Sequence, residues 1–166
     1  MKSFTIHDFN TWEEYASFMR YMIAKSDRFS LVYFKYTEEE KWLQTVERVY
    51  NTLKPYIVYE KAVDKWPGTV TLNENNHIYN MVVYKSVSEV EEALLLAFSL
   101  YAWDYPILPM DLCFYINGYA WFELCAHERW NRLIVDRNSV VKDLLNMGVG
   151  LVQNNDVDES ELFNLM

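Results

Sequence analysis

The sequence contains little cysteine, glycine or proline. Its 166 residues include two cysteines, four glycines and four prolines. Two cysteines are too few for a disulfide scaffold or a four-thiolate zinc site, so we expect Cys113 and Cys125 to be free thiols in a reducing compartment. The scattered glycines form no phosphate-binding loop, which excludes kinases and dinucleotide-binding proteins of that type. No linker-like cluster divides the chain, and we expect a single domain.

Long apolar runs are also missing. The most apolar window, residues 93–102, is far shorter than the ~20 residues that a membrane span needs. Near the N-terminus, Asp8, Glu13 and Glu14 interrupt the stretch in which a secretion signal needs an unbroken apolar core. We therefore expect a cytoplasmic protein without a membrane span.

Positive charge is scarce as well. The chain has 15 Lys and Arg residues against 24 Asp and Glu residues, a formal net charge of −9. This charge repels phosphate backbones and argues against a nucleic-acid partner, whereas it suits a basic protein partner. The last thirteen residues contain four acidic residues and no Lys or Arg. We expect an acidic, solvated C-terminal tail over 154–166, after a domain over 1–153.

Apolar residues make up 51% of the chain and aromatic residues 17%, enough for a sizeable folded core. Thr11, Thr37 and Ser88 each precede a glutamate by three residues, a spacing typical of a capped helix start. The helix after Ser88, over 89–102, is apolar on most sides, and we expect it to be the most buried one. A fourth helix is expected over 139–147, where a glycine follows.

Runs rich in β-branched and aromatic residues predict strands. Between two of them, Asn117-Gly118 is typical of a type I′ turn, which requires positive φ at both positions. A regular hairpin around this turn places Phe114 opposite Trp121. Both hairpin faces are largely apolar, so we predict an α+β fold, in which about four helices pack against a mostly antiparallel sheet. The expected strands are 31–36, 56–63, 77–84, 112–116, 119–125 and 148–153.

Ionisable residues of different types converge at the end of this hairpin. His127 and Glu128 follow its second strand, and Asp111 and Glu123 are expected to lie near them. One interpretation is a polar site for a small ligand or a reaction. The other is structural: His127 orients the chain that leaves the hairpin, and Glu128 pairs with one of the arginines that follow.

We predict no catalytic residue, metal site or cofactor. A zinc hydrolase needs a second histidine one helical turn from the first, and His7 and His77 are remote in the sequence. Cys125 and His127 are two positions apart, which on a strand places them on one face without making a catalytic triad. The hairpin also lacks the basic residues that RNA-binding sheets combine with aromatic ones.

The segment 103–111 joins the third predicted helix to the hairpin. It combines two prolines with large side chains, among them Trp103 and Tyr105. Trp and Tyr are frequent anchors of protein interfaces, so the segment is a candidate recognition loop. Alternatively, its apolar side chains close one end of the core.

Between positions 103 and 128 the sequence contains Trp103, Pro106, Leu108-Pro109, Asp111-Leu112, Phe114-Tyr115, Gly118, Trp121-Phe122 and His127-Glu128. This pattern resembles small bacterial proteins of toxin-immunity type. The resemblance covers about a sixth of the chain and implies an intracellular immunity or antitoxin role. In such a role, a compact acidic protein binds and blocks a basic nuclease or another effector.

We expect a protein partner to be recognised by acidic and aromatic side chains that border the loop and the hairpin. Acidic side chains would steer a basic partner, and aromatic ones would anchor it. The candidate partner-binding residues are Trp103, Asp104, Tyr105, Asp111, Glu123, His127 and Glu128.

Overall fold

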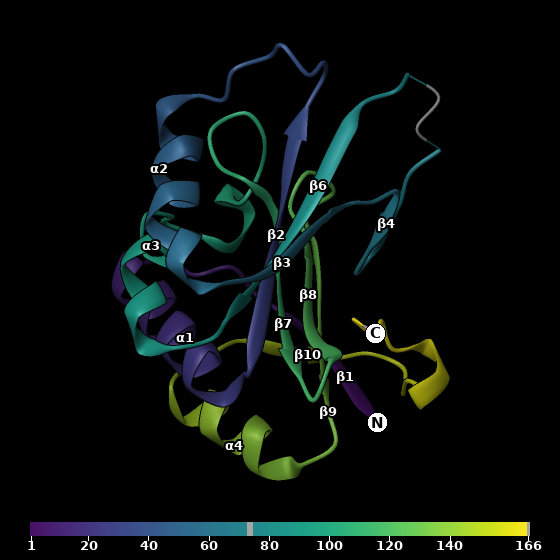
Figure 1. The fold of residues 1–166 in the computed structure, drawn as a ribbon. Coiled ribbons are helices and arrows are strands. Elements are labelled where there is room, and N and C mark those ends of the chain that lie inside the picture. The colour runs from purple at the N-terminus through teal and green to yellow at the C-terminus, as the bar shows by residue number, and fades with distance from the viewer. Residues whose placement is uncertain (73–74, 166) are drawn as a thin grey trace.

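The computed structural model describes residues 1–72 and 75–165. Eight strands form one sheet in the order β10-β1-β9-β8-β7-β2-β6-β3, and β4 and β5 form a separate two-stranded ribbon (Figure 1). All strand pairs are antiparallel. The strands are β1 (Lys2–Ile6), β2 (Arg28–Lys35), β3 (Ile57–Ala62), β4 (Lys65–Trp66), β5 (Thr69–Val70), β6 (Ile78–Lys85), β7 (Met110–Ile116), β8 (Tyr119–Cys125), β9 (Trp130–Val135) and β10 (Leu151–Gln153).

Helices cover one face of this sheet, and the main core lies between the two layers. Together with the sheet they confirm the predicted α+β fold. Figure 1 shows α1, α2 and α3 on that face and α4 at the end of the sheet near β9. Among the described residues, no helix is long and apolar enough to cross a membrane. The helices are α1 (Trp12–Lys25), α2 (Gln44–Leu53), α3 (Glu91–Leu94) and α4 (Asn138–Asn146).

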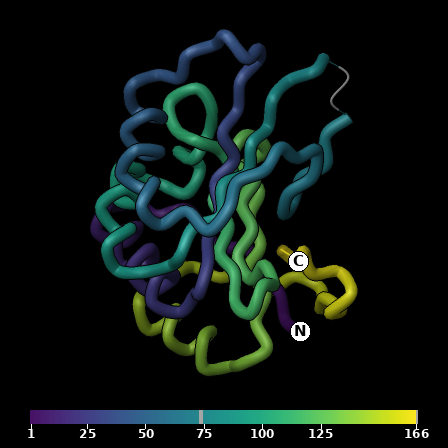
Figure 2. The backbone as a smooth tube through the Cα atoms, viewed as in Figure 1, coloured from purple at the N-terminus to yellow at the C-terminus, as the bar shows by residue number. Residues whose placement is uncertain are grey.

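The opposite face of the sheet is covered by the β4–β5 ribbon and by the C-terminal segment. Trp66 of the ribbon is buried in a second apolar cluster with Val32 and Met81 of the sheet. Phe163 and Leu165 pack on a third cluster, which contains Tyr115. Both termini lie on this side, close to each other (Figure 2), and the Met1 ammonium group donates to the Val157 carbonyl at 2.8 Å.

Two predicted helix ends agree with the structure. The Thr11 hydroxyl accepts a hydrogen bond from the Glu14 N–H at 3.2 Å, which caps the start of α1. Gly148 follows α4 with φ of +81°, and its N–H binds the Leu145 carbonyl. A residue without a Cβ adopts this left-handed conformation at little cost, so the helix ends there.

The predicted helix over 89–102 is wrong. Only Glu91–Leu94 is α-helical, with 3-10 turns at 88–90 and 100–102. Side chains of a distant segment bind the backbone groups that a longer helix would pair internally. The Tyr15 hydroxyl donates to the Leu94 carbonyl, and the Asp8 carboxylate accepts from the Leu100 N–H. Tertiary hydrogen bonds therefore override the local helical pattern.

The helix predicted to begin near Thr37 begins instead at Gln44. The Glu40 carboxylate accepts from the Tyr36 N–H and from the Tyr105 hydroxyl, so it stabilises a loop rather than the first turn of a helix. The helix buries Val46, Val49 and Leu53.

The predicted hairpin is confirmed, but its register is corrected. Asn117 and Gly118 have φ of +52° and +84°. Past the turn, Phe114 pairs with Phe122 rather than with Trp121, because a bulge shifts the register. Trp121 enters the core on the helix side, where its indole N–H donates to the Ser26 hydroxyl at 2.9 Å.

The segment expected to be a solvated tail is held against the sheet. The Ala120 N–H donates to the Phe163 carbonyl and the Leu165 N–H to the Gly118 carbonyl, each at 2.9 Å. Its anchoring side chains are apolar, which explains why an acidic segment can pack. Its four acidic side chains, Asp156, Asp158, Glu159 and Glu161, are exposed.

Candidate functional site

Three of the seven predicted partner-binding residues are closed off from solvent. Trp103 is fully buried, and its indole N–H donates to the Tyr15 hydroxyl at 2.9 Å, so this end of the segment closes the core. Asp111 and Glu123 are each only 1% exposed. A partner cannot contact these three side chains in this conformation.

Glu123 forms an ion pair within the sheet. Its Oε2 lies 2.8 Å from Nη2 of Arg132, which β9 places directly opposite. Burial raises the pKa of Glu123, and the Arg132 charge opposes that rise. The predicted pairing of Glu128 with a following arginine is thus wrong for Arg132, and the Arg129 guanidinium lies over the Tyr101 ring instead.

The other four predicted residues are accessible. Asp104 and Tyr105 are half-buried, while the side chains of His127 and Glu128 are 45% and 69% exposed. The Tyr105 hydroxyl donates to Glu40, which ties the segment to the loop between β2 and α2. Burial raises the pKa of Asp104, and His127 acts in the opposite direction.

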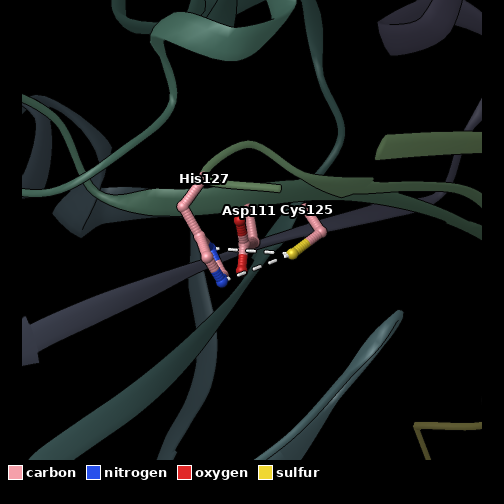
Figure 3. Close-up of side chains that lie close together, drawn as sticks. All are labelled: Asp111, Cys125 and His127. Atoms are coloured by element: carbon pink, nitrogen blue, oxygen red, sulfur yellow. Dashed lines mark hydrogen bonds between the residues drawn. The ribbon is translucent and has the colours of Figure 1, made fainter. Parts of the chain in front are cut away.

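Asp111 and His127 lie together as predicted, and Cys125 joins them (Figure 3). One ligand atom from each of the three residues lies within 4.8 Å of the others. The Cys125 sulfur is 3.6 Å from Nδ1 of His127 and 3.8 Å from Nε2. Asp111 comes from the start of β7 and Cys125 from the end of β8, so the hairpin itself brings the side chains together.

The β4–β5 ribbon supports this cluster from outside the hairpin. The Trp66 indole N–H donates to Oδ2 of Asp111 at 2.8 Å, and the Ala126 N–H donates to Oδ1 at 2.9 Å. The Thr69 hydroxyl donates to the Cys125 sulfur at 3.6 Å. These contacts fix the carboxylate and the thiol in place.

The cluster does not have the electrostatics of a cysteine nucleophile. Such a nucleophile needs a lowered thiol pKa, which stabilises the thiolate. Here burial raises the pKa of Cys125, and the Asp111 charge raises it further. Burial likewise raises the pKa of Asp111. The arrangement offers a sulfur, a nitrogen and an oxygen donor, which suit coordination better than nucleophilic attack.

A pocket of about 300 Å³ opens beside the cluster. His127 and Glu128 form part of its wall, and four of the other eight lining residues are aromatic. The residues that line it include Phe34, Trp66, Thr69, Tyr79, Tyr105 and His127.

A second concave site lies on the side of the molecule that carries both termini. We call it the C-terminal groove: a cavity of about 270 Å³ between the β7–β8 turn, the end of β9, α4 and the C-terminal segment. Its lining is mostly apolar, with Asp136 and Glu159 as its carboxylates and no Lys or Arg side chain. The apolar side chains include Ile116, Tyr119, Val140 and Leu162.

Sequence reasoning did not find the ribbon residues or the groove. Trp66 and Thr69 belong to strands of two residues each, too short to leave a periodic pattern. The groove is assembled from segments that are remote in the sequence. The available signal for the cluster was the two-residue spacing of Cys125 and His127, although Cys125 ends β8 and His127 lies in the turn after it rather than on the strand.

Comparisons with protein families, with curated proteins and with solved structures found no match to this chain. The geometry of the two sites is therefore the basis on which a function is inferred.

Proposed function

We propose that this chain is a binding protein of immunity or antitoxin type, which captures a basic protein partner in the C-terminal groove. The observation that carries the proposal is the composition of the groove, an apolar floor with carboxylates and without a Lys or Arg side chain in its lining. A net charge of −9 adds long-range attraction for such a partner. The blocking role rests on the resemblance over residues 103–128.

The groove fits a segment that is apolar on one side and basic on the other. Ile116 and Met1, each 37% exposed, offer contact area to apolar side chains. Asp136 is largely exposed at the wall, and its nearest cation, Arg137, lies 4.0 Å away and is also exposed. Apolar contact supplies affinity, while exposed charges mainly raise the rate of association.

Asp158, Glu159 and Glu161 place three carboxylates in one short turn, and Glu159 of this turn lines the groove. Asp158 and Glu161 form a capping box, in which the Asp158 N–H binds the Glu161 carboxylate at 2.9 Å. This turn is held to the sheet by the apolar residues that follow it. The charges are therefore presented on an ordered segment, which lowers the entropy cost of binding.

A capture experiment with matched variants tests the proposal. We expect wild-type protein to retain a basic protein from a lysate of its host at low salt, and Asp136→Asn/Glu159→Gln to retain much less of that same protein. The control is Glu38→Gln/Glu39→Gln, which removes two exposed carboxylates from the loop that follows β2. The start of β2, and not this loop, pairs with β7 next to the β7–β8 turn of the groove. Equal capture by both double variants, or a captured protein that is acidic, would contradict the proposal.

A small-ligand site is the second candidate. The pocket beside His127 favours it, because aromatic walls around a few polar groups are typical of ligand sites. In that case Tyr105→Ala, which removes a wall of the pocket, weakens binding of the ligand and leaves capture of a protein partner unchanged. A loss of protein capture in Tyr105→Ala would instead favour a partner at this pocket.

A further inference from the structure

The Asp111, Cys125 and His127 side chains have the donor set of a zinc site. Zinc is bound in proteins by cysteine sulfur, histidine nitrogen and carboxylate oxygen, commonly in tetrahedral geometry. A site with three protein ligands leaves the fourth position for water or another donor. Harder cations such as Mg²⁺ and Ca²⁺ prefer oxygen ligands alone, so the sulfur and nitrogen donors select a softer metal.

The spacing of the donors agrees with this geometry. Bonds of about 2.3 Å to sulfur and about 2.0 Å to nitrogen, at a tetrahedral angle, place the two donor atoms about 3.5 Å apart. The Cys125 sulfur and Nδ1 of His127 are 3.6 Å apart. The Asp111 oxygen completes a set within 4.8 Å. His127 is exposed on one side, so its ring can adjust without disturbing the core.

The contacts around the donors resemble the outer shell of a metal site. The two carboxylate oxygens of Asp111 are each oriented by one N–H donor, from Trp66 and Ala126, and each keeps a further lone pair. Such outer contacts orient ligands and are a usual part of metal sites. Asp111 also has φ of +58°, an unusual backbone conformation that aims its side chain at the end of the hairpin.

Charge balance favours the same assignment. Asp111 is 1% exposed, and an isolated carboxylate at that depth is costly. No Lys or Arg side chain is paired with it among the described residues. A divalent cation bound by one carboxylate, one thiolate and a neutral imidazole gives a site with no net charge.

We propose that Asp111, Cys125 and His127 bind one zinc ion, with its fourth position directed toward the pocket that His127 lines. This inference is independent of the C-terminal groove, which shares no lining residue with the pocket. The ligand at the fourth position is water, or an anionic or nitrogen donor small enough for a pocket of about 300 Å³.

Metal titration of the full chain tests the inference. The protein is first treated with a chelator, which is then removed. Zinc added to this protein should bind at one ion per chain, and Co²⁺ added instead should give a thiolate charge-transfer band. Cys125→Ser should abolish that band, and both Cys125→Ser and His127→Ala should weaken zinc binding by at least about tenfold. Cys113→Ser and His7→Ala are matched controls with the same changes at residues outside the cluster, and should bind as wild type.

The folded state of each variant is checked by its circular dichroism and melting temperature. If Cys125→Ser does not fold, His127→Ala still tests the zinc site, because His127 is exposed and its loss leaves no cavity. Zinc should raise the melting temperature of wild type and both controls, because a ligand that binds only the folded state stabilises it. Wild-type protein without zinc uptake, a cobalt complex without a thiolate band, or unchanged zinc affinity in His127→Ala would overturn the inference.

Discussion

Tyr15 connects two parts of the core through one hydroxyl group. It donates to the Leu94 carbonyl at 2.8 Å and accepts from the Trp103 indole N–H at 2.9 Å, and all three residues are buried. Burial raises the pKa of Tyr15 far above its ordinary value, so the hydroxyl stays protonated. This hydroxyl group therefore joins α1 to the short α3 and to Trp103, which begins the segment before β7.

Replacing that hydroxyl should be costly. Tyr15→Phe leaves a buried carbonyl and a buried indole N–H without partners, and we expect a loss of about 2 kcal/mol in the free energy of unfolding. Chemical denaturation measures this change. Tyr21→Phe is the control, because the Tyr21 hydroxyl binds Asp143 at a half-buried position where water can replace it. A similar loss in both variants would mean that the buried hydroxyl has no special role.

Glu123 should make the free energy of unfolding depend on pH. Burial raises its pKa in the folded state above the ordinary value of 4.5. The folded protein then binds this proton more tightly than the unfolded chain, so the contribution of Glu123 to stability falls as pH rises from about 4.5 through the raised folded value. Glu123→Gln removes this titration but keeps an acceptor for Arg132.

The measurement is the difference in unfolding free energy between wild type and Glu123→Gln across that pH range. Asp104 and Asp111 are present in both proteins, so their own raised pKa values cancel in the difference. We expect wild type to lose stability relative to the variant as pH rises. Parallel curves would show that Arg132 fully offsets the burial of Glu123.

At the scale of elements, the turn of the β4–β5 ribbon is held by a close contact. Gly68 has φ of +76°, and a Cβ there would lie 2.7 Å from the Trp130 ring of β9. Gly148 has a nearly equal φ of +81°, with nothing within 4 Å of its Cβ position. A side chain at either position would meet similar backbone strain, and only at Gly68 would it also collide with a neighbouring ring.

Alanine at each glycine separates these effects. Gly148→Ala should lower the free energy of unfolding by about 1 kcal/mol from backbone strain alone. Gly68→Ala should cost more, because the Trp130 ring must move as well. Thermal and denaturant unfolding of the two variants provide the comparison. A smaller loss at Gly68 would indicate that the ribbon turn is loosely packed.

Local sequence signals predicted some elements well and failed for others in a consistent way. The Asn117-Gly118 turn and the Thr11 cap depend on neighbouring residues, and both are present. The bulge lies beside Trp121, whose indole N–H binds the distant Ser26. The helix over 89–102 is interrupted where distant side chains bind its backbone. Such contacts leave no trace in a window of ten residues, so periodicity alone could not reveal them.

At the scale of the whole molecule, the candidate sites also combine features that the local sequence predicts with features that depend on distant residues. The neighbourhood of Asp111 and His127 follows from the hairpin and was predicted. Its support by Trp66 follows from the placement of the ribbon, which no local pattern specifies. Glu123 was assigned to the same neighbourhood, yet its strand position directs it to Arg132.

The role of the C-terminal segment also differs between the sequence and the whole fold. In the sequence it is an acidic run. In the fold, its apolar residues pack on the sheet, and one of its acidic residues, Glu159, lines the C-terminal groove. Removing the whole segment would therefore expose the sheet as well as remove charge. Point substitutions at Asp136 and Glu159 separate these two effects.

The most direct test of the proposed function is the association rate of the captured partner at low salt and at about 0.3 M salt, where charges are screened over a few ångströms. We predict that Asp136→Asn/Glu159→Gln slows association severalfold at low salt, and that high salt removes most of this difference. Glu38→Gln/Glu39→Gln should have a much smaller effect. An association rate that is insensitive to salt and equal in wild type and both double variants would contradict capture of a basic partner in the C-terminal groove.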